Sequence, residues 1–363
     1  MKTSDQKVDS IYKVTKLQVF FSVLAILLFV FIQVGQNYHL DKVILSPGTA
    51  DSVSKTIHIQ GAKSYNPNGT IRFLTVLVTT NRPTLFEFLK AKYYDDDTEI
   101  IKWEEIRGDI SSNDENAMNQ AAMTASQNSA KVVALTKLGC DVKKSGEGAL
   151  ITNVEKDSAA SKFNIKATNI ITAIDGTNVS TDQDAVSILS KHKPGEEIVL
   201  YIRTNSISDA KEYKVILGEN PKKPGVGFLG VGLSTSLLKF DYPINIEIEQ
   251  GDVSGPSAGL AFTLSIIDKL TVGELTGGKD YAVTGEIGID GKVYPVGGVA
   301  QKAVAAKNSG AKFMIVPKGE AKDAKPKVGK MKLFEVENID QALKVLNKNG
   351  GDPLPQVRAC PNS

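Results

Sequence analysis

The stretch SGPSAGLAF, residues 254–262, holds a serine in a setting suited to covalent chemistry. Ser257 follows Pro256 and has small neighbours on both sides, so a peptide backbone can approach it closely. These residues also complete Gly255-x-Ser257-x-Gly259, a pattern typical of a nucleophilic serine at a sharp turn before a helix. A serine that merely begins a helix gives the same pattern, so the interpretation depends on finding a base.

A helix is predicted to begin at this serine, after a half-buried strand at 243–250. Pro256 suits the first helical turn, and Ser254 is the expected cap. The backbone N–H groups of Ser257 and Ala258 are then the expected donors to an oxyanion. The helix itself is predicted from apolar residues at helical spacing, namely Leu260, Leu264 and Ile267.

Histidine is not the expected base. The chain has three histidines, His39, His58 and His192, and all of them precede Ser257. The α/β-hydrolase order of serine, then acid, then histidine is therefore excluded.

A lysine can accept the proton if burial or a helix N-terminus lowers its pKa from about 10.4. Lys302 lies in the first turns of a helix predicted to begin near Gly298, with alanine and valine next to it. Lys307 falls at the C-terminal end of that helix and Lys292 on a hairpin arm, where a lysine stays charged. Lys302 is therefore the expected base.

The composition is that of a globular protein and gives no sign of a nucleic-acid or nucleotide partner. The net charge of the 363 residues is +2, and no basic stripe is interleaved with aromatic residues. The glycine-rich runs at 225–230 and 273–279 lack the context that phosphate-binding loops need. Cys140 and Cys360 match no metal spacing, and their pairing stays open. We expect no cofactor and no metal.

The uncharged apolar run at 17–34 is about 27 Å long as a helix, close to the thickness of a bilayer core. It is longer than the core of a signal peptide and no cleavage motif follows it, so a retained anchor is favoured over a cleaved signal. Because positive charge marks the cytoplasmic side, the N-terminus is expected in the cytoplasm and the rest outside. The lysines that precede the run are Lys2, Lys7, Lys13 and Lys16.

The order of elements in 148–204 resembles a PDZ domain. The matching pieces are a helix start at 157–160, a strand and turn at 170–176, and a Pro-Gly turn at 194–195. A PDZ domain binds an extended peptide as an added strand at a sheet edge. The alternative is a small α/β domain without a ligand, and the groove residues are not fixed by the sequence.

Three segments resemble the proteolytic domain of the Lon family in motif, order and spacing. They are GPSAG at 255–259, VTGEIGIDGKVYPVGGVAQK at 283–302 and GAKFMIVPKGE at 310–320. The resemblance implies that Ser257 and Lys302 form a Ser-Lys catalytic dyad and that Thr284 helps to hold the lysine.

One position departs from the Lon pattern. Ser254 stands where Lon proteases often carry an aspartate, and Asp252 lies two residues earlier.

The whole layout resembles the membrane-anchored PDZ–Lon-like serine proteases of bacteria, which lack the ATPase module of other Lon proteases. It implies an α+β multidomain fold with an N-terminal transmembrane helix. The expected parts are a cytoplasmic tail (1–16), an anchor (17–35), an α/β region with a long helix (40–138), a PDZ-like domain (139–218), a linker (219–232), a Lon-like proteolytic domain (233–347) and a tail (348–363).

The resemblance implies an ATP-independent serine endopeptidase that cleaves unfolded or flexible proteins outside the cytoplasm, with the PDZ-like domain recognising substrate ends. It also implies a homo-oligomer, of which a hexamer is one form. The alternative is a catalytically silent PDZ adaptor that oligomerises through its Lon-like domain.

Overall fold

The computed structural model describes residues 15–108, 112–205, 208–221, 223–249, 251, 253–355 and 360. It divides into two compact units. Unit 1 comprises residues 1–58, 64–131 and 247–355, and unit 2 comprises 59–63, 132–246 and 356–363. The main part of unit 2, residues 132–246, is thus an insertion in the sequence of unit 1, which the chain leaves at Lys131 and enters again at Glu247.

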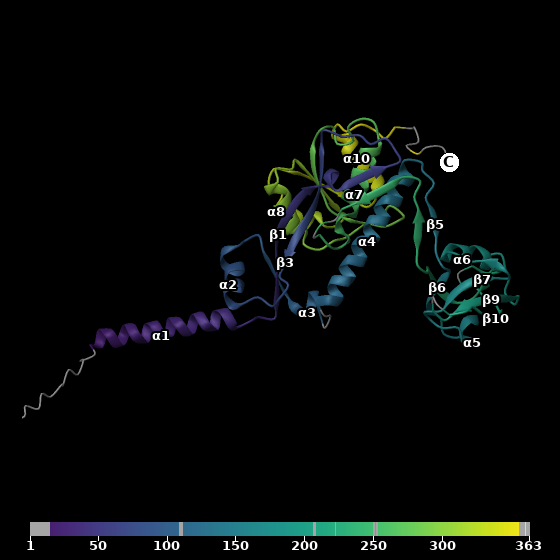
Figure 1. Ribbon diagram of the computed structural model, residues 1–363, viewed down its shortest axis with the longest axis horizontal. Coiled ribbons are helices and arrows are strands. Elements are labelled where there is room, and N and C mark those ends of the chain that lie inside the picture. The colour runs from purple at the N-terminus through teal and green to yellow at the C-terminus, as the bar shows by residue number, and fades with distance from the viewer. Residues whose placement is uncertain are drawn as a thin grey trace, which may run out of the picture. The chain divides into compact units, whose positions relative to one another are not determined.

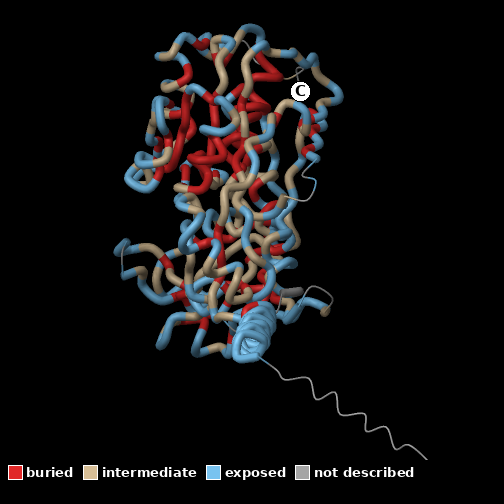
Figure 2. The backbone as a smooth tube through the Cα atoms, turned by 90° about the vertical axis from the view of Figure 1, so that its left-hand side faces the viewer, coloured by how far each residue is buried: buried red, intermediate tan, exposed pale blue. Residues whose placement is uncertain are grey.

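The N-terminal helix α1 (Lys16–Asn37) is long and apolar enough to cross a membrane, a criterion that a signal sequence also meets. Thr15 begins it with a capping box, in which Thr15 and Gln18 exchange side-chain and backbone hydrogen bonds. Its side chains are exposed along its length (Figure 2). Near its end, Gly35 is buried beneath Phe86 of α2 (Leu85–Tyr94), so the last turns of α1 pack on α2.

Unit 1 is built on a six-stranded mixed sheet in the order β20-β19-β16-β3-β1-β4. β16, β19 and β20 run parallel to one another and to β3, whereas β1 is antiparallel to both β3 and β4. The strands are β1 (Lys42–Ser52), β3 (Thr70–Val78), β4 (Glu99–Lys102), β16 (Asp280–Val283), β19 (Phe313–Pro317) and β20 (Lys332–Val336).

We expected 40–138 to form a region of its own, but its strands complete the sheet of the C-terminal residues. The physical reason is that β16 pairs with β3 along one edge and with β19 along the other, so neither half of the chain makes the sheet alone. β1 and β3 lie beside each other in Figure 1, and α8 packs against both.

The helices of unit 1 cover this sheet. α7 is buried at every residue, as expected for a helix that is apolar on nearly all sides. α8 packs Val299, Ala303 and Ala306 into a core that also holds Leu74, Met314 and Val316. The helices are α3 (Trp103–Ile106), α4 (Ser112–Lys137, whose last six residues fall in unit 2), α7 (Gly259–Leu270), α8 (Val299–Asn308), α9 (Ala321–Ala324) and α10 (Ile339–Lys348). The shorter elements are η1 (Val53–Lys55), η2 (Pro256–Ala258), β17 (Glu286–Ile287) and β18 (Val293–Tyr294), together with β2 (Ile57–Gln60) and β15 (Asn245–Ile248), each of which falls partly in unit 2.

Unit 2 holds a second sheet, in the order β10-β9-β7-β6-β13, with β8 added beside β7. Alternate residues of its strands are buried together with residues of α5 and α6. The elements are β6 (Ala149–Val154), α5 (Ala159–Lys162), β7 (Ile170–Ile174), β8 (Thr177–Asn178), α6 (Asp182–Leu189), β9 (Glu197–Arg203), β10 (Lys211–Ile216) and β13 (Val231–Thr235). The short strands are β5 (Lys143–Ser145), β11 (Gly218–Glu219), β12 (Gly227–Phe228) and β14 (Lys239–Asp241).

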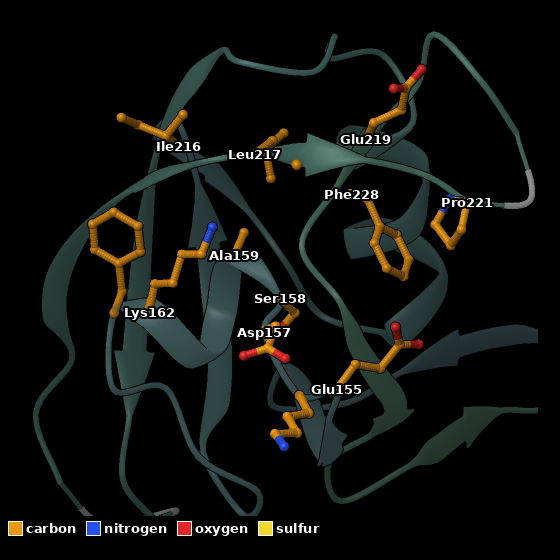
Figure 3. Close-up of a pocket in the computed structure, with 13 residues that line it drawn as sticks. Glu155, Asp157, Ser158, Ala159, Lys162, Ile216, Leu217, Glu219, Pro221 and Phe228 are labelled. Carbon is orange, nitrogen blue, oxygen red and sulfur yellow. The ribbon is translucent and has the colours of Figure 1, made fainter.

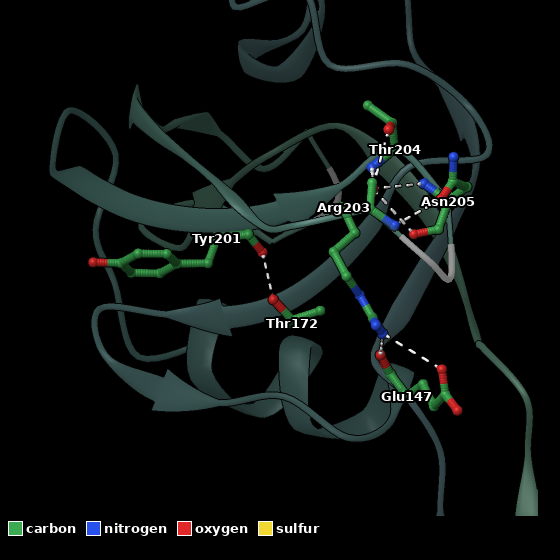
Figure 4. A network of polar contacts seen from close by, with 7 residues as sticks. Glu147, Thr172, Tyr201, Arg203, Thr204 and Asn205 are labelled. Atoms are coloured by element: carbon green, nitrogen blue, oxygen red, sulfur yellow. Dashed lines mark hydrogen bonds and ion pairs between the residues drawn. The ribbon is translucent and has the colours of Figure 1, made fainter.

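Polar contacts connect the strands of unit 2 to one another and to the segment before β6. Arg203 of β9 donates to the backbone carbonyl of Glu147 at 2.7 Å and pairs with its carboxylate at 3.6 Å (Figure 4). Thr172 of β7 donates to the carbonyl of Tyr201 at 3.1 Å. Cys140 and Cys360, whose pairing the sequence left open, form a disulfide in this unit.

We expected 219–232 to be a linker, but part of it is ordered into unit 2. β13 begins at Val231 and pairs with β6, which would otherwise be an edge of the sheet. Leu229 is buried in the core of the unit. The Pro/Gly content of this stretch therefore marks a tight loop that leads into the last strand of the sheet.

Candidate active site

The turn that carries Ser257 is a single 3₁₀ turn, η2, which leads directly into α7. Pro256 occupies its first position, as expected. The cap is Gly255, at φ +92°, and not Ser254 as we predicted, since no side chain caps this turn. The left-handed backbone at Gly255 makes the sharp bend that a serine side chain would resist.

Helix α4 and the segment after β16 hold this turn in place. Ser126 of α4 donates to the Pro256 carbonyl at 2.8 Å. The Ser257 carbonyl accepts from the Gly285 N–H at 2.9 Å and from the Thr284 hydroxyl at 3.3 Å. The backbone of Ser257 is therefore fixed from two sides, while its side chain is half-buried.

Thr284 is fully buried, and its hydroxyl contacts the serine turn. We predicted that it helps to hold Lys302. Among the described residues its hydrogen bond goes to the Ser257 backbone and none goes to Lys302. The structure thus places Thr284 as a link between β16 and the serine turn.

Lys302 lies in the first half of α8, as predicted from its alanine-rich surroundings. Gly298 precedes the helix at φ +67°, and the Lys302 N–H donates to the Gly298 carbonyl at 2.9 Å. The lysine is only 3% exposed, and within the described chain no hydrogen bond engages its ammonium. Burial lowers the Lys302 pKa to about 8, against the opposing effect of the negative charge of Glu320.

Ser257 and Lys302 line the same cavity, of about 300 Å³. The serine turn contributes Val253, Ser254, Gly255 and Ala258 to its wall. The opposite wall is made by Thr49 of β1 and by residues 74–77 of β3. Asp252 lies outside the described residues. Ser257 and Lys302, a hydroxyl residue and an amine residue with a lowered pKa, thus line one small cavity near the start of the buried helix α7.

The other candidate bases lie in different surroundings. Lys292 is 67% exposed and pairs with Asp290 at 3.0 Å, which raises the pKa of this lysine. Lys307 is exposed in the last turn of α8. His39 and His58 are exposed, and none of the three histidines lines this cavity. The structure thus leaves Lys302 as the base candidate beside Ser257.

Residues 74–77 of β3 were missed by the sequence interpretation as part of the site. A strand at 70–80 is predicted from its composition, and the structure has it at Thr70–Val78. Nothing in the sequence places it beside a serine almost two hundred residues later. Only the pairing of β3 with β16 brings the two segments together.

Unit 2 carries a separate groove between α6 and the edge strand β13. The cavity, of about 160 Å³, is lined by Val186 and Leu189 of α6 and by Ser190, which follows the helix. Its other wall is formed by Val231 and Leu233 of β13 and by the loop at 226–230. The groove is mostly apolar and runs along a strand that ends the sheet, so an extended peptide can pair there.

A second and larger cavity of unit 2, about 570 Å³, is drawn in Figure 3. Glu155, Asp157 and Lys162 line it from the α5 side, and Ile216 and Glu219 from the other. Its lining charges are of both signs, so it favours no single class of ligand. Phe228 lines both this cavity and the groove beside β13.

Comparison with known proteins matches two parts of the chain. Residues 235–348 match the Lon protease (S16) C-terminal proteolytic domain, and residues 136–212 match the PDZ domain. The Lon protease of Trichlorobacter lovleyi is 38% identical over 124 residues, which cover 32% of this chain and 15% of that protein. The Lon protease of Elusimicrobium minutum is 32% identical over 190 residues, which cover 48% of this chain and 22% of that protein.

The chain thus spans about a fifth or less of the length of these relatives. Among solved structures, the PDZ domain of an SdrC-like protein from Listeria monocytogenes is 20% identical, with a TM-score of 0.21. That match covers 24% of this chain and 87% of the other.

Proposed function

The chain carries a Lon-type proteolytic domain and a PDZ domain, and from this premise we propose that it is a membrane-anchored serine endopeptidase that works without ATP. We propose Ser257 as the nucleophile and Lys302 as the general base. One observation carries the proposal: the two residues line one cavity, and the lysine there is buried, with its pKa lowered to about 8.

The proposed reaction begins with neutral Lys302, which takes the proton of the Ser257 hydroxyl as the serine oxygen attacks a peptide carbonyl. The N–H groups of Ser257 and Ala258 lie in the first turn, where helix geometry provides no intrahelical acceptor, and they stabilise the oxyanion. Lys302 then gives its proton to the leaving amine. Water hydrolyses the acyl-enzyme and restores both groups.

The unpaired end of β3 supports the proposal that the substrates are unfolded or flexible chains. β16 pairs only with Thr70–Phe73 of β3, and in the described chain no strand continues beside residues 74–77 on that side. These same residues line the cavity with Ser257. We propose that an extended substrate segment adds to this edge and so brings its carbonyl to the serine.

The groove of unit 2 supports a role in recognising substrate ends. It combines an apolar lining with the edge strand β13, the two features that bind an extended peptide at a sheet edge. We propose that this groove binds protein chain ends and delivers them for cleavage.

Two features support an extracytoplasmic location. The helix α1 is suited to a single membrane span, and the lysines before it favour a cytoplasmic N-terminus. The Cys140–Cys360 disulfide fits an oxidising compartment. The likeness to Lon proteases supports a homo-oligomer, such as a hexamer, and light scattering of the detergent-solubilised protein would test it.

The central experiment is hydrolysis of an intrinsically disordered protein by the full chain in detergent, without ATP. Ser257→Ala and Lys302→Met should each abolish cleavage, whereas Lys307→Met, on the exposed end of the same helix, should leave it unchanged. Full activity of either site variant would show that the dyad assignment is wrong.

The alternative function is a silent PDZ adaptor that oligomerises through its Lon-like domain. A fluorophosphonate or a peptidyl boronate distinguishes the two, because each reacts with an activated serine. Labelling of Ser257 that is lost in Lys302→Met supports the protease. A folded wild-type protein that stays unlabelled supports the adaptor.

A further inference from the structure

Glu320 lies in the turn after β19, directly before α9, and contacts the loop that leads into α8. Its Oε1 accepts a hydrogen bond from the Val296 N–H at 2.8 Å. Val296 lies between β18 and α8, and the two residues that follow it are Gly297 and Gly298. Because glycines leave a loop conformationally free, a side chain that holds Val296 restricts how α8 begins.

The second oxygen of this carboxylate has no such partner. Glu320 Oε2 is buried and, among the described residues, accepts no hydrogen bond. A buried polar atom without a partner costs free energy and calls for an explanation. Glu320 directly precedes α9, which packs on α8, the helix that carries the buried Lys302. Its charge and that of Lys302 act on each other in both directions.

Other charged residues occur on the elements packed against α8, but in the described chain Glu320 alone shifts the Lys302 pKa through its charge. Arg72 of β3 is engaged by Asp280 at 2.8 Å. The remaining charged groups on these elements are Lys42 and Asp51 of β1, Lys307 of α8 itself, Lys312 and Lys318 beside β19, and Lys322 and Asp323 of α9. Glu320 is therefore the charged residue whose substitution should change the titration of Lys302.

We propose that Glu320 is a positioning residue for this site. One oxygen holds the loop that leads into α8, and the negative charge of the carboxylate opposes the effect of burial on Lys302. The inference rests on the proposed function in so far as Lys302 is the base.

The two roles separate in two substitutions. Glu320→Gln keeps an oxygen that accepts from the Val296 N–H but removes the charge, whereas Glu320→Ala removes both. Since the charge of Glu320 favours protonated Lys302, its loss should lower the Lys302 pKa. For a change of about 0.5 to 1 in the pKa, the neutral fraction of Lys302 at pH 6.5 should rise about 3- to 8-fold.

A matched control, Glu335 of β20, contacts the same turn. Glu335 accepts from the Gly319 and Ala321 N–H groups at 2.8 and 3.0 Å, so it also holds backbone with a carboxylate. It is exposed and does not shift the Lys302 pKa. Glu335→Gln should therefore leave the titration of Lys302 unchanged.

The decisive measurement is the pKa of Lys302, obtained by competitive labelling of amines with acetic anhydride across a pH series and mass spectrometry. The full-length Ser257→Ala protein in detergent serves as background, so the result does not depend on catalysis. A lower Lys302 pKa in Glu320→Gln, with none in Glu335→Gln, supports the proposal. An unchanged or higher pKa in Glu320→Gln overturns it.

Activity then tests the second role. In the Ser257 protein, Glu320→Gln should cleave a flexible peptide about 3- to 8-fold faster at pH 6.5 and equally fast on the alkaline plateau. Glu320→Ala should cleave more slowly on the plateau, because the loop before α8 loses its hydrogen bond at Val296. A Glu320→Ala variant with the full plateau rate would overturn the proposed role of this hydrogen bond. If the wild type cleaves nothing while the labelling shift is present, the proposed function fails and the link between Glu320 and Lys302 stands.

Discussion

At the scale of single residues, the protonation of one buried amine governs the proposed reaction. Burial lowers the Lys302 pKa to about 8, so at pH 7 most molecules carry a protonated lysine that cannot accept the serine proton. We predict that kcat/KM rises about tenfold per pH unit below pH 8 and levels off above it. Hydrolysis of a flexible peptide between pH 6 and 10 checks this. Lys307→Met should keep the same midpoint, and a profile flat across this range would exclude Lys302 as the base.

The same shift predicts a gain in stability when the lysine is removed. The folded state holds the Lys302 proton less tightly than the unfolded chain, so the penalty is fully present below pH 8 and disappears as the pH rises past 10.5. Lys302→Met should therefore raise the free energy of unfolding at pH 7 by up to about 3 kcal/mol. Circular dichroism melts at pH 7 and pH 10 check it, because the gain should shrink at the higher pH. A loss of stability at pH 7 would contradict this account.

Ser257 and Lys302 could be proposed from the sequence because their chemistry depends on local features. Small neighbours around a serine, and alanines around a lysine near a helix start, are visible in sequence order. Glu320 could not be found in this way, since its role depends on a turn after β19 reaching Val296 before α8. The cap at Ser254 was predicted wrongly because the backbone of Gly255, not a side chain, makes the bend.

At the scale of elements, the turn before α7 depends on one left-handed glycine. A Cβ at Gly255 would meet no atom within 4 Å, so Gly255→Ala costs only backbone strain. At φ +92° and ψ 158°, a region that is essentially restricted to glycine, this strain is about 1–3 kcal/mol. We predict that this variant also loses activity, because relief of the strain moves Ser257. Gly310→Ala is the matched control, since Gly310 also has positive φ and open space but follows α8. Thermal melts should show a loss of stability for both variants, and a catalytic rate of Gly255→Ala equal to that of Gly310→Ala would contradict the prediction.

The groove between α6 and β13 yields a second prediction at this scale. Val186 lines the groove and is 50% exposed, so Val186→Lys places a charge there without disturbing the core. Binding of peptides to the full chain should weaken about tenfold or more, as for an unpaired charge in an apolar site. Ile216→Lys is the control, because Ile216 is similarly exposed and lines the other cavity of the unit. Fluorescence anisotropy measures both, and stronger weakening by Ile216→Lys would assign peptide binding to that cavity.

At the scale of the whole molecule, the order of segments in the sequence does not reveal which strands share a sheet. Strands at 70–80 and at 243–250 could each be predicted from local composition and alternation. That residues 40–131 share a sheet with 280–336 could not be predicted, because the pairing of β3 with β16 joins segments about two hundred residues apart. Residues 132–246, which hold most of the match to the PDZ domain, are consequently an insertion in the sequence of unit 1.

The inserted position of residues 132–246 leads to a prediction that would not follow from consecutive domains. The chain leaves unit 1 at Lys131 and enters it again at Glu247. Close to these two points, Gln127 of α4 donates to the Ile248 carbonyl at 3.4 Å. The two ends of the insertion are therefore close enough for a short link, as in other tolerated domain insertions. We predict that unit 1 still folds in detergent when residues 132–246 are replaced by a few Gly and Ser residues and Cys360 is changed to Ser.

This shortened protein should cleave short flexible peptides at close to the wild-type rate, because every described residue that lines the Ser257 cavity belongs to unit 1. It should lose any preference for protein substrates with a particular chain end, because the groove between α6 and β13 is gone. Paired assays with a short peptide and a disordered protein measure both effects. The Ser257→Ala version of the shortened protein is the blank. A shortened protein that melts cooperatively yet cleaves no peptide would mean that unit 2 takes part in catalysis itself and does more than recognise substrates.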